Sequence, residues 1–152
     1  GGTEVLARFG DAIVLRSLKA WRERDHVCIR CEWEAERAPA KDYRLFIQLR
    51  TGLRSIRAEA FVPACGSLPT GLWQTGFRLE ETYEIGIPEN GLEYEIWIGW
   101  HRGWRRLSIT DSCRPVFWRA LGLGPILRLS DNALTCNSLE RRVVPREGNR
   151  KD

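Results

Sequence analysis

The sequence predicts an all-β protein, an antiparallel β-sandwich of about eight strands. Apolar and polar residues alternate over short segments, as they do in strands that bury one face. These segments recur at intervals of about ten residues and are separated by turn-forming residues, a spacing typical of sandwiches. Residues 1–110 contain no convincing helical pattern. Together these observations favour two packed sheets.

The element with the heaviest aromatic load spans residues 94–109. Tyr94, Ile96, Ile98 and Trp100 fall at every second position, so they share one face of a strand and predict its core-facing row. A turn at residues 101–103 and a return run at residues 104–109 complete a predicted hairpin.

The other strands are predicted from the same alternation. In the first of them the pattern slips around Ser17, which indicates a bulge. In a weaker strand, Ile56, Ala58 and Ala60 lie on one side. An irregular segment at residues 62–76 is rich in Gly and Pro and has Trp73 as its large anchor. In chain order the expected strands cover residues 12–21, 27–34, 43–49, 54–61, 78–87 and 121–129.

The length of 152 residues predicts a single domain with its own core. We expect the β-sandwich to occupy residues 1–129 and a polar C-terminal extension to occupy residues 130–152. The chain lacks Met and begins Gly1-Gly2, so we expect either a piece of a longer protein or the remnant of a tag at this end. Neither a signal peptide nor a membrane span is recognisable, which favours a soluble polypeptide.

The composition favours an ordinary globular domain over a disordered one. Lys and Arg number 24 against 20 Asp and Glu, which gives a net charge of +4, and 43% of the residues are hydrophobic. The basic residues are interleaved with Glu, whereas nucleic-acid binders gather them on a stripe. Only Arg102, Arg105 and Arg106, beside Trp100 and Trp104, form a basic aromatic cluster.

The five cysteines do not predict a metal site. Cys28 and Cys31 have CxxC spacing, but residues three apart on a strand point to opposite faces, so one strand cannot offer both to one zinc ion. We expect Cys31 in the core and Cys28 on the outer face. A disulfide among Cys65, Cys113 and Cys136 stays open, because nothing in their spacing selects a pair.

The polar residues do not predict catalysis, and we expect no cofactor. His26 and His101 lie in predicted turns, without the three or four ligands that a metal needs. Glu32 and Glu34 share an outer strand face and could form a carboxylate pair. Charged residues that alternate outward are nevertheless typical of a solvated face, so we interpret the protein as a non-enzyme.

Seven short motifs, taken in order, resemble a known family. The motifs are Phe9-Gly10-Asp11 with Ile13 and Leu15, the strand ending at Trp33, Asp42-Tyr43 with Phe46 and Gln48-Leu49, Leu68-Pro69-Thr70 with Trp73 and Gly76, Tyr83 to Pro88, Tyr94 to Gly99, and Leu123-Gly124-Pro125-Ile126. Over residues 9–129 the chain resembles the soluble C-terminal β-sandwich domain of bacterial membrane glycosyltransferases of the dolichyl-phosphate-mannose mannosyltransferase type.

The resemblance implies a jelly-roll-like or immunoglobulin-like sandwich on the extracytoplasmic side of a membrane enzyme. A role in holding a glycan or a lipid-linked sugar is plausible for such a domain. The sequence departs from the pattern in its cysteines, around residues 113–118 and in its long tail.

The aromatic residues supply the candidate binding site. Trp97 is out of phase with the core row, so it should lie on the opposite face of its strand, either exposed or covered by the tail. Exposed indoles stack on sugar rings, and Arg, Glu and Gln can bond to sugar hydroxyls. The candidate carbohydrate contacts are therefore Trp97, Trp104, Arg102 and Arg106, with Gln48 and Glu95 as hydroxyl partners.

Two alternatives remain beside carbohydrate binding. The exposed aromatic face could dock on a membrane-protein host or on a second copy of the chain. A weaker alternative is single-stranded nucleic acid held by stacking and phosphate contacts on the hairpin, although we expect no nucleic-acid partner.

Overall fold

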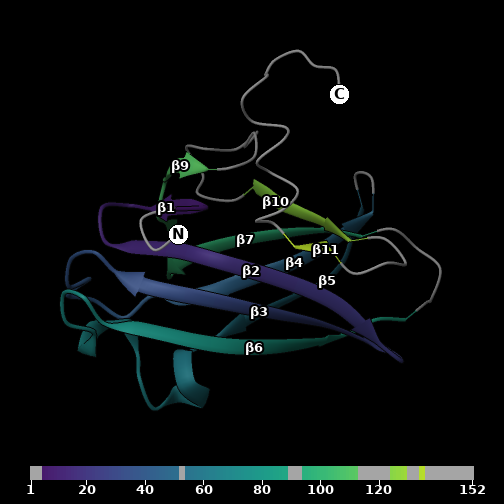
Figure 1. Cartoon of the computed structure of the whole chain (residues 1–152), viewed down its shortest axis with the longest axis horizontal. Helices are drawn as coiled ribbons and strands as arrows, with labels where there is room; N and C mark the ends of the chain where they lie inside the picture. The colour runs from purple at the N-terminus through teal and green to yellow at the C-terminus, as the bar shows by residue number, and fades with distance from the viewer. Residues whose placement is uncertain (1–4, 52–53, 89–93, 113–123, 130–133, 136–152) are drawn as a thin grey trace.

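The protein is a sandwich of two antiparallel sheets, which face each other in the computed structural model (Figure 1). The structure describes residues 5–51, 54–88, 94–112, 124–129 and 134–135. Within these residues no helix has the length and apolar character needed to cross a membrane. The two sheets confirm the predicted all-β fold.

The first sheet has the strand order β6-β3-β2-β1-β9, with β11 paired to β2. All of its strand pairs are antiparallel. Its strands are β1 (Ala7–Phe9), β2 (Ile13–Glu23), β3 (His26–Ala35), β6 (Arg78–Gly86), β9 (Ile109–Ser112) and β11 (Leu134–Thr135).

The second sheet has the strand order β10-β7-β4-β5, with the short β8 paired to β7. Two 3₁₀ turns, η1 (Pro63–Gly66) and η2 (Thr70–Leu72), interrupt the connection from this sheet back to β6. The strands of the second sheet are β4 (Arg44–Thr51), β5 (Arg54–Phe61), β7 (Tyr94–Arg102), β8 (Arg105–Arg106) and β10 (Gly124–Leu129).

The number of strands agrees with the prediction, since eight of the described strands are four residues or longer. Each of the strands expected from alternation is present near its expected bounds. Trp73 is the buried anchor of the segment between β5 and β6, as expected. β11 lies beyond residue 129, where we placed the end of the sandwich, and residues 136–152 lie outside the described part.

The bulge expected in the first long strand is present. The pairing of β2 with β3 shifts between Leu15 and Ser17, so Arg16 is the extra residue. Because of this extra residue, Leu15 and Leu18 share the core-facing side of β2 although they are three positions apart, and both are fully buried. A second bulge, between Leu49 and Arg50, changes the phase of β5.

The second bulge corrects the prediction for β5. Ile56 packs against the core, as an inward residue would. Ala58 and Ala60 instead pair with Gln48 and Phe46, whose side chains alternate with the buried row of β4, so the two alanines are exposed on the outer face. Alternation alone missed this, because one extra residue reverses the faces of all that follows.

The core is centred on tryptophans contributed by both sheets. Trp33 of β3 and Trp100 of β7 are fully buried, and their rings meet edge to face with centroids 5.0 Å apart and planes at 76°. Phe9 packs on Trp33 at 5.9 Å, and Trp73 packs on Trp100 at 6.0 Å. The facing sheets are therefore held together by a contact between large aromatic rings.

The predicted inner row of the aromatic hairpin is confirmed, because Tyr94, Ile96, Ile98 and Trp100 are all fully buried. The return run is shorter than expected. β8 has only two residues, after which the chain crosses to the other sheet as β9. Two backbone hydrogen bonds stabilise the connection from β8 to β9: Leu107 N–H donates to Trp100 O at 2.9 Å, and Gly10 N–H donates to Ser108 O at 2.7 Å.

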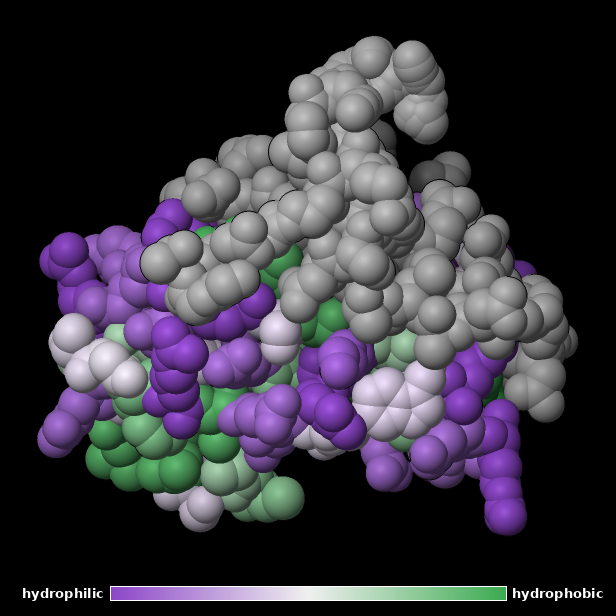
Figure 2. Space-filling model, viewed as in Figure 1, coloured by the Kyte–Doolittle hydropathy of each residue, from purple (hydrophilic) through white to green (hydrophobic). Residues whose placement is uncertain are grey.

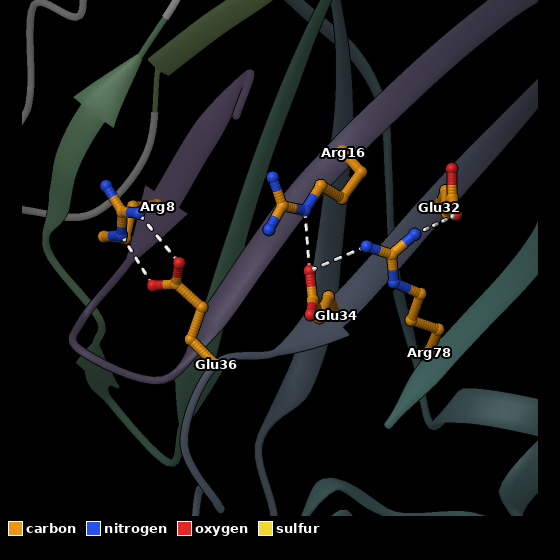
Figure 3. A network of polar contacts seen from close by, with 6 residues as sticks. All are labelled: Arg8, Arg16, Glu32, Glu34, Glu36 and Arg78. Atoms are coloured by element: carbon orange, nitrogen blue, oxygen red, sulfur yellow. Dashed lines mark hydrogen bonds and ion pairs between the residues drawn. The ribbon is translucent and has the colours of Figure 1, made fainter. Parts of the chain in front are cut away.

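The outer face of the first sheet carries a network of ion pairs (Figure 3). Arg16 of β2 reaches Glu34 of β3 at 2.6 Å, and Arg78 of β6 lies between Glu34 and Glu32 at 3.5 and 3.4 Å. Because arginines occupy both carboxylates, the arrangement favours our interpretation of Glu32 and Glu34 as a charged outer face.

A bidentate pair stands at the β1 end of this network (Figure 3). Arg8 Nε and Nη2 donate to the two carboxylate oxygens of Glu36 at 2.8 and 2.9 Å. These hydrogen bonds lower the pKa of the Glu36 carboxyl below its ordinary value, against the opposing effect of desolvation.

Replacing the central indole should weaken the fold. Trp33→Phe removes part of the core ring and the N–H that donates to Tyr83 Oη at 3.0 Å, so we expect a loss of about 1–3 kcal/mol in the free energy of unfolding. Trp104→Phe, on an indole that is 88% exposed, should change it by less than about 0.5 kcal/mol. Urea unfolding of both variants checks the difference, and equal losses would contradict this core.

The Arg8–Glu36 pair should make stability depend on pH. A carboxyl whose pKa is lower in the folded than in the unfolded state stabilises the fold above the unfolded pKa, near 4.3, and loses this effect as the pH falls through the folded pKa. We expect Glu36→Gln to cost about 0.5 kcal/mol at pH 7 and almost nothing at pH 3. Urea unfolding across this range measures the difference.

The variant Arg8→Gln is the control for this pH dependence. It should reproduce the loss, and the double variant should lose no more than either single one. A penalty for Glu36→Gln that stays constant with pH would contradict the assignment.

Candidate functional site

The residues expected from the sequence fall into two separate groups. Gln48, Glu95 and Trp97 lie together on the outer face of the second sheet, where Gln48 is the cross-strand partner of Trp97. Arg102, Trp104 and Arg106 lie at one end of that sheet, in and beside the turn between β7 and β8. The structure does not bring the two groups into one site.

Trp97 occupies the predicted face but is not exposed. Only 7% of the residue is accessible, and the Arg50 guanidinium lies 4.8 Å from the ring centroid. The indole N–H donates to Glu95 Oε1 at 3.0 Å. Of the two alternatives for Trp97, exposure is therefore wrong, because the indole is buried and the Arg50 guanidinium lies over its ring.

Gln48 is also engaged within the protein. Its amide nitrogen donates to Ser55 Oγ at 2.9 Å, and its amide oxygen accepts from Arg50 Nη1 at 3.3 Å. Together with the Trp97–Glu95 bond, these contacts form a polar cluster that joins β4, β5 and β7. The cluster fits a role in fixing strand positions better than a role in holding a ligand.

The turn between β7 and β8, unlike the cluster around Trp97, is exposed to solvent. Trp104 is 88% exposed, and Arg102, Arg105 and Arg106 are exposed around it. A two-residue loop, Gly103-Trp104, joins the paired residues Arg102 and Arg105. Gly103 has φ +63°, and the two-residue turns that are favoured in hairpins need a positive φ at this first central position. The turn places Trp104 at the tip of the hairpin.

An open pocket of about 220 Å³ adjoins this turn. Three arginines of the hairpin contribute one side, and the loop before β4 contributes the other. The lining residues are Lys41, Tyr43, Arg102, Arg105, Arg106 and Leu107.

Buried Thr70 of η2 holds the second side of the pocket in place. Its hydroxyl donates to Lys41 O at 2.6 Å and accepts from Tyr43 N–H at 2.8 Å. Next to it, Gly71 N–H donates to a carboxylate oxygen of Asp42 at 3.0 Å. A backbone loop and a 3₁₀ turn are thereby fixed to each other, which fixes the positions from which Lys41 and Tyr43 face the hairpin.

The pocket is strongly basic. Residues 41–44 and 101–107 carry five Lys and Arg residues against one carboxylate, Asp42, which is already bonded to Gly71. None of the ion pairs formed between described residues involves the four cations of the lining. Cations gathered around a concave surface create a positive potential that attracts an anionic group.

Aromatic rings support two of these arginines. Arg106 lies over the Phe46 ring at 5.2 Å, and Arg105 lies 5.8 Å from the Trp104 centroid. Phe46 in turn meets His101 edge to face at 5.9 Å. Two of the guanidinium groups beside the pocket therefore lie over aromatic rings, at distances typical of cation–π contacts.

Sequence reasoning found half of this site and missed the rest. Arg102, Trp104 and Arg106 were expected, and Arg105 was visible in the basic aromatic cluster. Lys41 and Tyr43 were missed, because a loop about 60 residues earlier reaches the hairpin only through tertiary contacts. No sequence pattern could have found them, because the hydrogen bonds from Thr70 that hold their loop in place are tertiary contacts.

The histidines have local partners. His26 Nδ1 lies 2.8 Å from Asp25 Oδ1, and His101 Nδ1 lies 3.0 Å from Gly103 O. Within the part of the chain that the structure describes, no group of three or more His, Cys, Asp or Glu side chains could hold a metal ion.

Cys28 and Cys31 point to opposite faces of β3, as expected, and both are buried as free thiols. Cys28 is thus on the outer face but is not exposed. Burial raises the pKa of both thiols, and Glu23 and Glu84 raise that of Cys28 further. Cys65 is a free, exposed thiol, while Cys113 and Cys136 lie outside the described residues.

No protein-family model, curated protein or solved structure matches this chain. The fold and the site by themselves define a β-sandwich domain with a basic, aromatic pocket at one end.

Trp97→Ala should reveal a structural residue. Removing a buried indole that carries a cation and a hydrogen bond should lower the free energy of unfolding by about 3 kcal/mol. The same change at exposed Trp104 should cost less than about 0.5 kcal/mol. Thermal or urea unfolding checks both, and a Trp97→Ala protein of unchanged stability would contradict the buried position.

Proposed function

We propose that the protein is a non-catalytic accessory β-sandwich domain that binds carbohydrate at the hairpin end, with Trp104 as the stacking surface. The observation that carries this proposal is the 88% exposed indole beside a pocket of about 220 Å³ that is rich in hydrogen-bond donors. Sugar rings present apolar C–H faces that pack on an open indole, while guanidinium groups donate to hydroxyl oxygens.

The charge of the pocket selects among carbohydrates. Lys41, Arg102, Arg105 and Arg106 offer donors and positive charge, whereas Asp42 is occupied by Gly71. A sugar with a carboxylate, sulfate or phosphate group would form charge-assisted bonds, which are stronger than bonds to neutral hydroxyls. The preferred ligand in this proposal is therefore an anionic sugar.

The cluster around Trp97 is not part of the proposed site. Arg50 covers the indole, and Glu95 and Gln48 bond to neighbouring side chains. Of the six residues expected from the sequence, the proposal keeps Trp104, Arg102 and Arg106 and adds Lys41, Tyr43 and Arg105.

We also propose that the domain belongs to a larger membrane-associated glycosyltransferase, on the extracytoplasmic side. This part rests on the seven sequence motifs between residues 9 and 129. The alternative is a protein-interaction module, favoured by the same exposed Trp104, because tryptophan and arginine are enriched among the residues that dominate protein interfaces.

Trp104→Ala should weaken binding of an anionic sugar about fivefold, the effect of losing one stacking contact of about 1 kcal/mol. Titration of acidic and neutral oligosaccharides followed by calorimetry measures it. The matched control is Trp21→Ala, on a half-buried indole of the other sheet that also carries a guanidinium, from Arg30 at 5.3 Å.

The control should leave the affinity unchanged. The carbohydrate proposal fails if no acidic or neutral sugar binds, or if both variants lower the affinity equally. Concentration-dependent self-association that Trp104→Ala abolishes would favour the interaction module instead.

A further inference from the structure

The described residues include only two large, strongly exposed hydrophobic side chains, Trp104 at 88% and Leu72 at 63%. They are about 30 positions apart in the sequence, yet each belongs to a segment that forms or supports the basic pocket. Trp104 lies between the lining residues Arg102 and Arg105. Leu72 ends η2, whose Thr70 and Gly71 bond to Lys41, Tyr43 and Asp42 on the opposite side of the pocket.

Other apolar residues of the segment between β5 and β6 are accessible as well. Figure 2 shows hydrophobic atoms gathered at the lower left, where Figure 1 draws the segment that contains η1 and η2. Partly or strongly exposed apolar residues of this segment are Val62, Ala64, Leu68, Pro69 and Leu72. A segment with accessible apolar side chains is therefore hydrogen-bonded to the loop that lines the basic pocket.

This combination matches the chemistry of a membrane surface. Anionic headgroups attract clustered Lys and Arg residues, tryptophan prefers the boundary between headgroups and acyl chains, and exposed aliphatic side chains insert just below it. The basic pocket matters for the choice of occupant, because a purely apolar partner would leave four desolvated cations without counter-charges.

We propose that the hairpin end docks on the surface of an anionic phospholipid bilayer, with the lipid phosphates in the pocket and Trp104 and Leu72 inserted at the interface. This goes beyond the binding of a sugar, since the lipid surface itself is the ligand. It also sets the orientation of the sandwich, with the turn between β7 and β8 directed toward the membrane and the paired residues Thr51 and Arg54 directed away.

The test is co-sedimentation of the protein with vesicles that carry no sugar, made either of phosphatidylcholine alone or of phosphatidylcholine with one third phosphatidylglycerol. We expect binding to the anionic vesicles only, and weaker binding at higher salt. The double variant Arg102→Gln/Arg105→Gln should lower the partition coefficient about 25-fold, at about fivefold for each basic residue near an anionic surface.

A matched control removes the same two charges elsewhere. Arg54 and Arg57 are exposed on β5 and pair with Thr51 and Leu49, at the end of β4 opposite to the Arg44–His101 pair beside the hairpin. Arg54→Gln/Arg57→Gln should change the partition coefficient less than twofold.

The apolar contacts have their own readout. Lipids brominated on their acyl chains should quench the emission of Trp104, and this quenching should disappear in Trp104→Phe. Leu72→Gln should lower vesicle binding several-fold and leave the affinity for a soluble anionic sugar unchanged, which separates this proposal from the carbohydrate site.

Three results would overturn the docking face. These are no binding to anionic vesicles, equal losses in the hairpin and β5 double variants, and a protein that binds vesicles without quenching of Trp104. Loss of sugar binding with intact vesicle binding would instead contradict the proposed function and leave the docking face standing.

Discussion

The contact between Trp33 and Trp100 is the interaction on which the rest of the structure depends. It joins β3 of one sheet to β7 of the other at 5.0 Å, and Phe9 and Trp73 complete the same aromatic centre. β7 continues directly from Trp100 into Arg102 and the exposed turn. Trp73 follows η2 in the chain, so the two sides of the basic pocket are both anchored to this one core contact.

The alternation of apolar and polar residues predicts which face of a strand a side chain occupies, and this sets how much of the fold the sequence could predict. A period of two assigns each side chain to a face, and the inner rows of β3, β4 and β7 are confirmed for this reason. It does not measure depth. Trp97 and Cys28 are both on the predicted outer faces and are both nearly inaccessible, because Arg50 stacks on Trp97 and Glu23 lies against the Cys28 thiol. For β5 even the face was wrong, since the bulge beside Arg50 shifted the phase.

The residues of the candidate site likewise fall into those that a sequence pattern could predict and those that it could not. Arg102, Trp104 and Arg106 are close together in the chain, so a local sequence pattern was enough to select them. Lys41 and Tyr43 reach the pocket only because the hydroxyl of buried Thr70 bonds to both sides of their loop, and a sequence pattern contains no sign of such a contact. Figure 3 gives the counterpart: the carboxylates that suggested a reactive pair, Glu32 and Glu34, are bound by arginines from neighbouring strands.

The central claim is that Trp97 belongs to the structure and Trp104 to function. Two-dimensional NMR of the indole N–H groups tests it most directly, by titrating the protein with an anionic sugar or with anionic lipid. The account predicts that the Trp104 resonance shifts, while the Trp97 resonance stays in place and exchanges slowly with solvent because of its bond to Glu95. A shift of the Trp97 resonance together with an unmoved Trp104 resonance would contradict it.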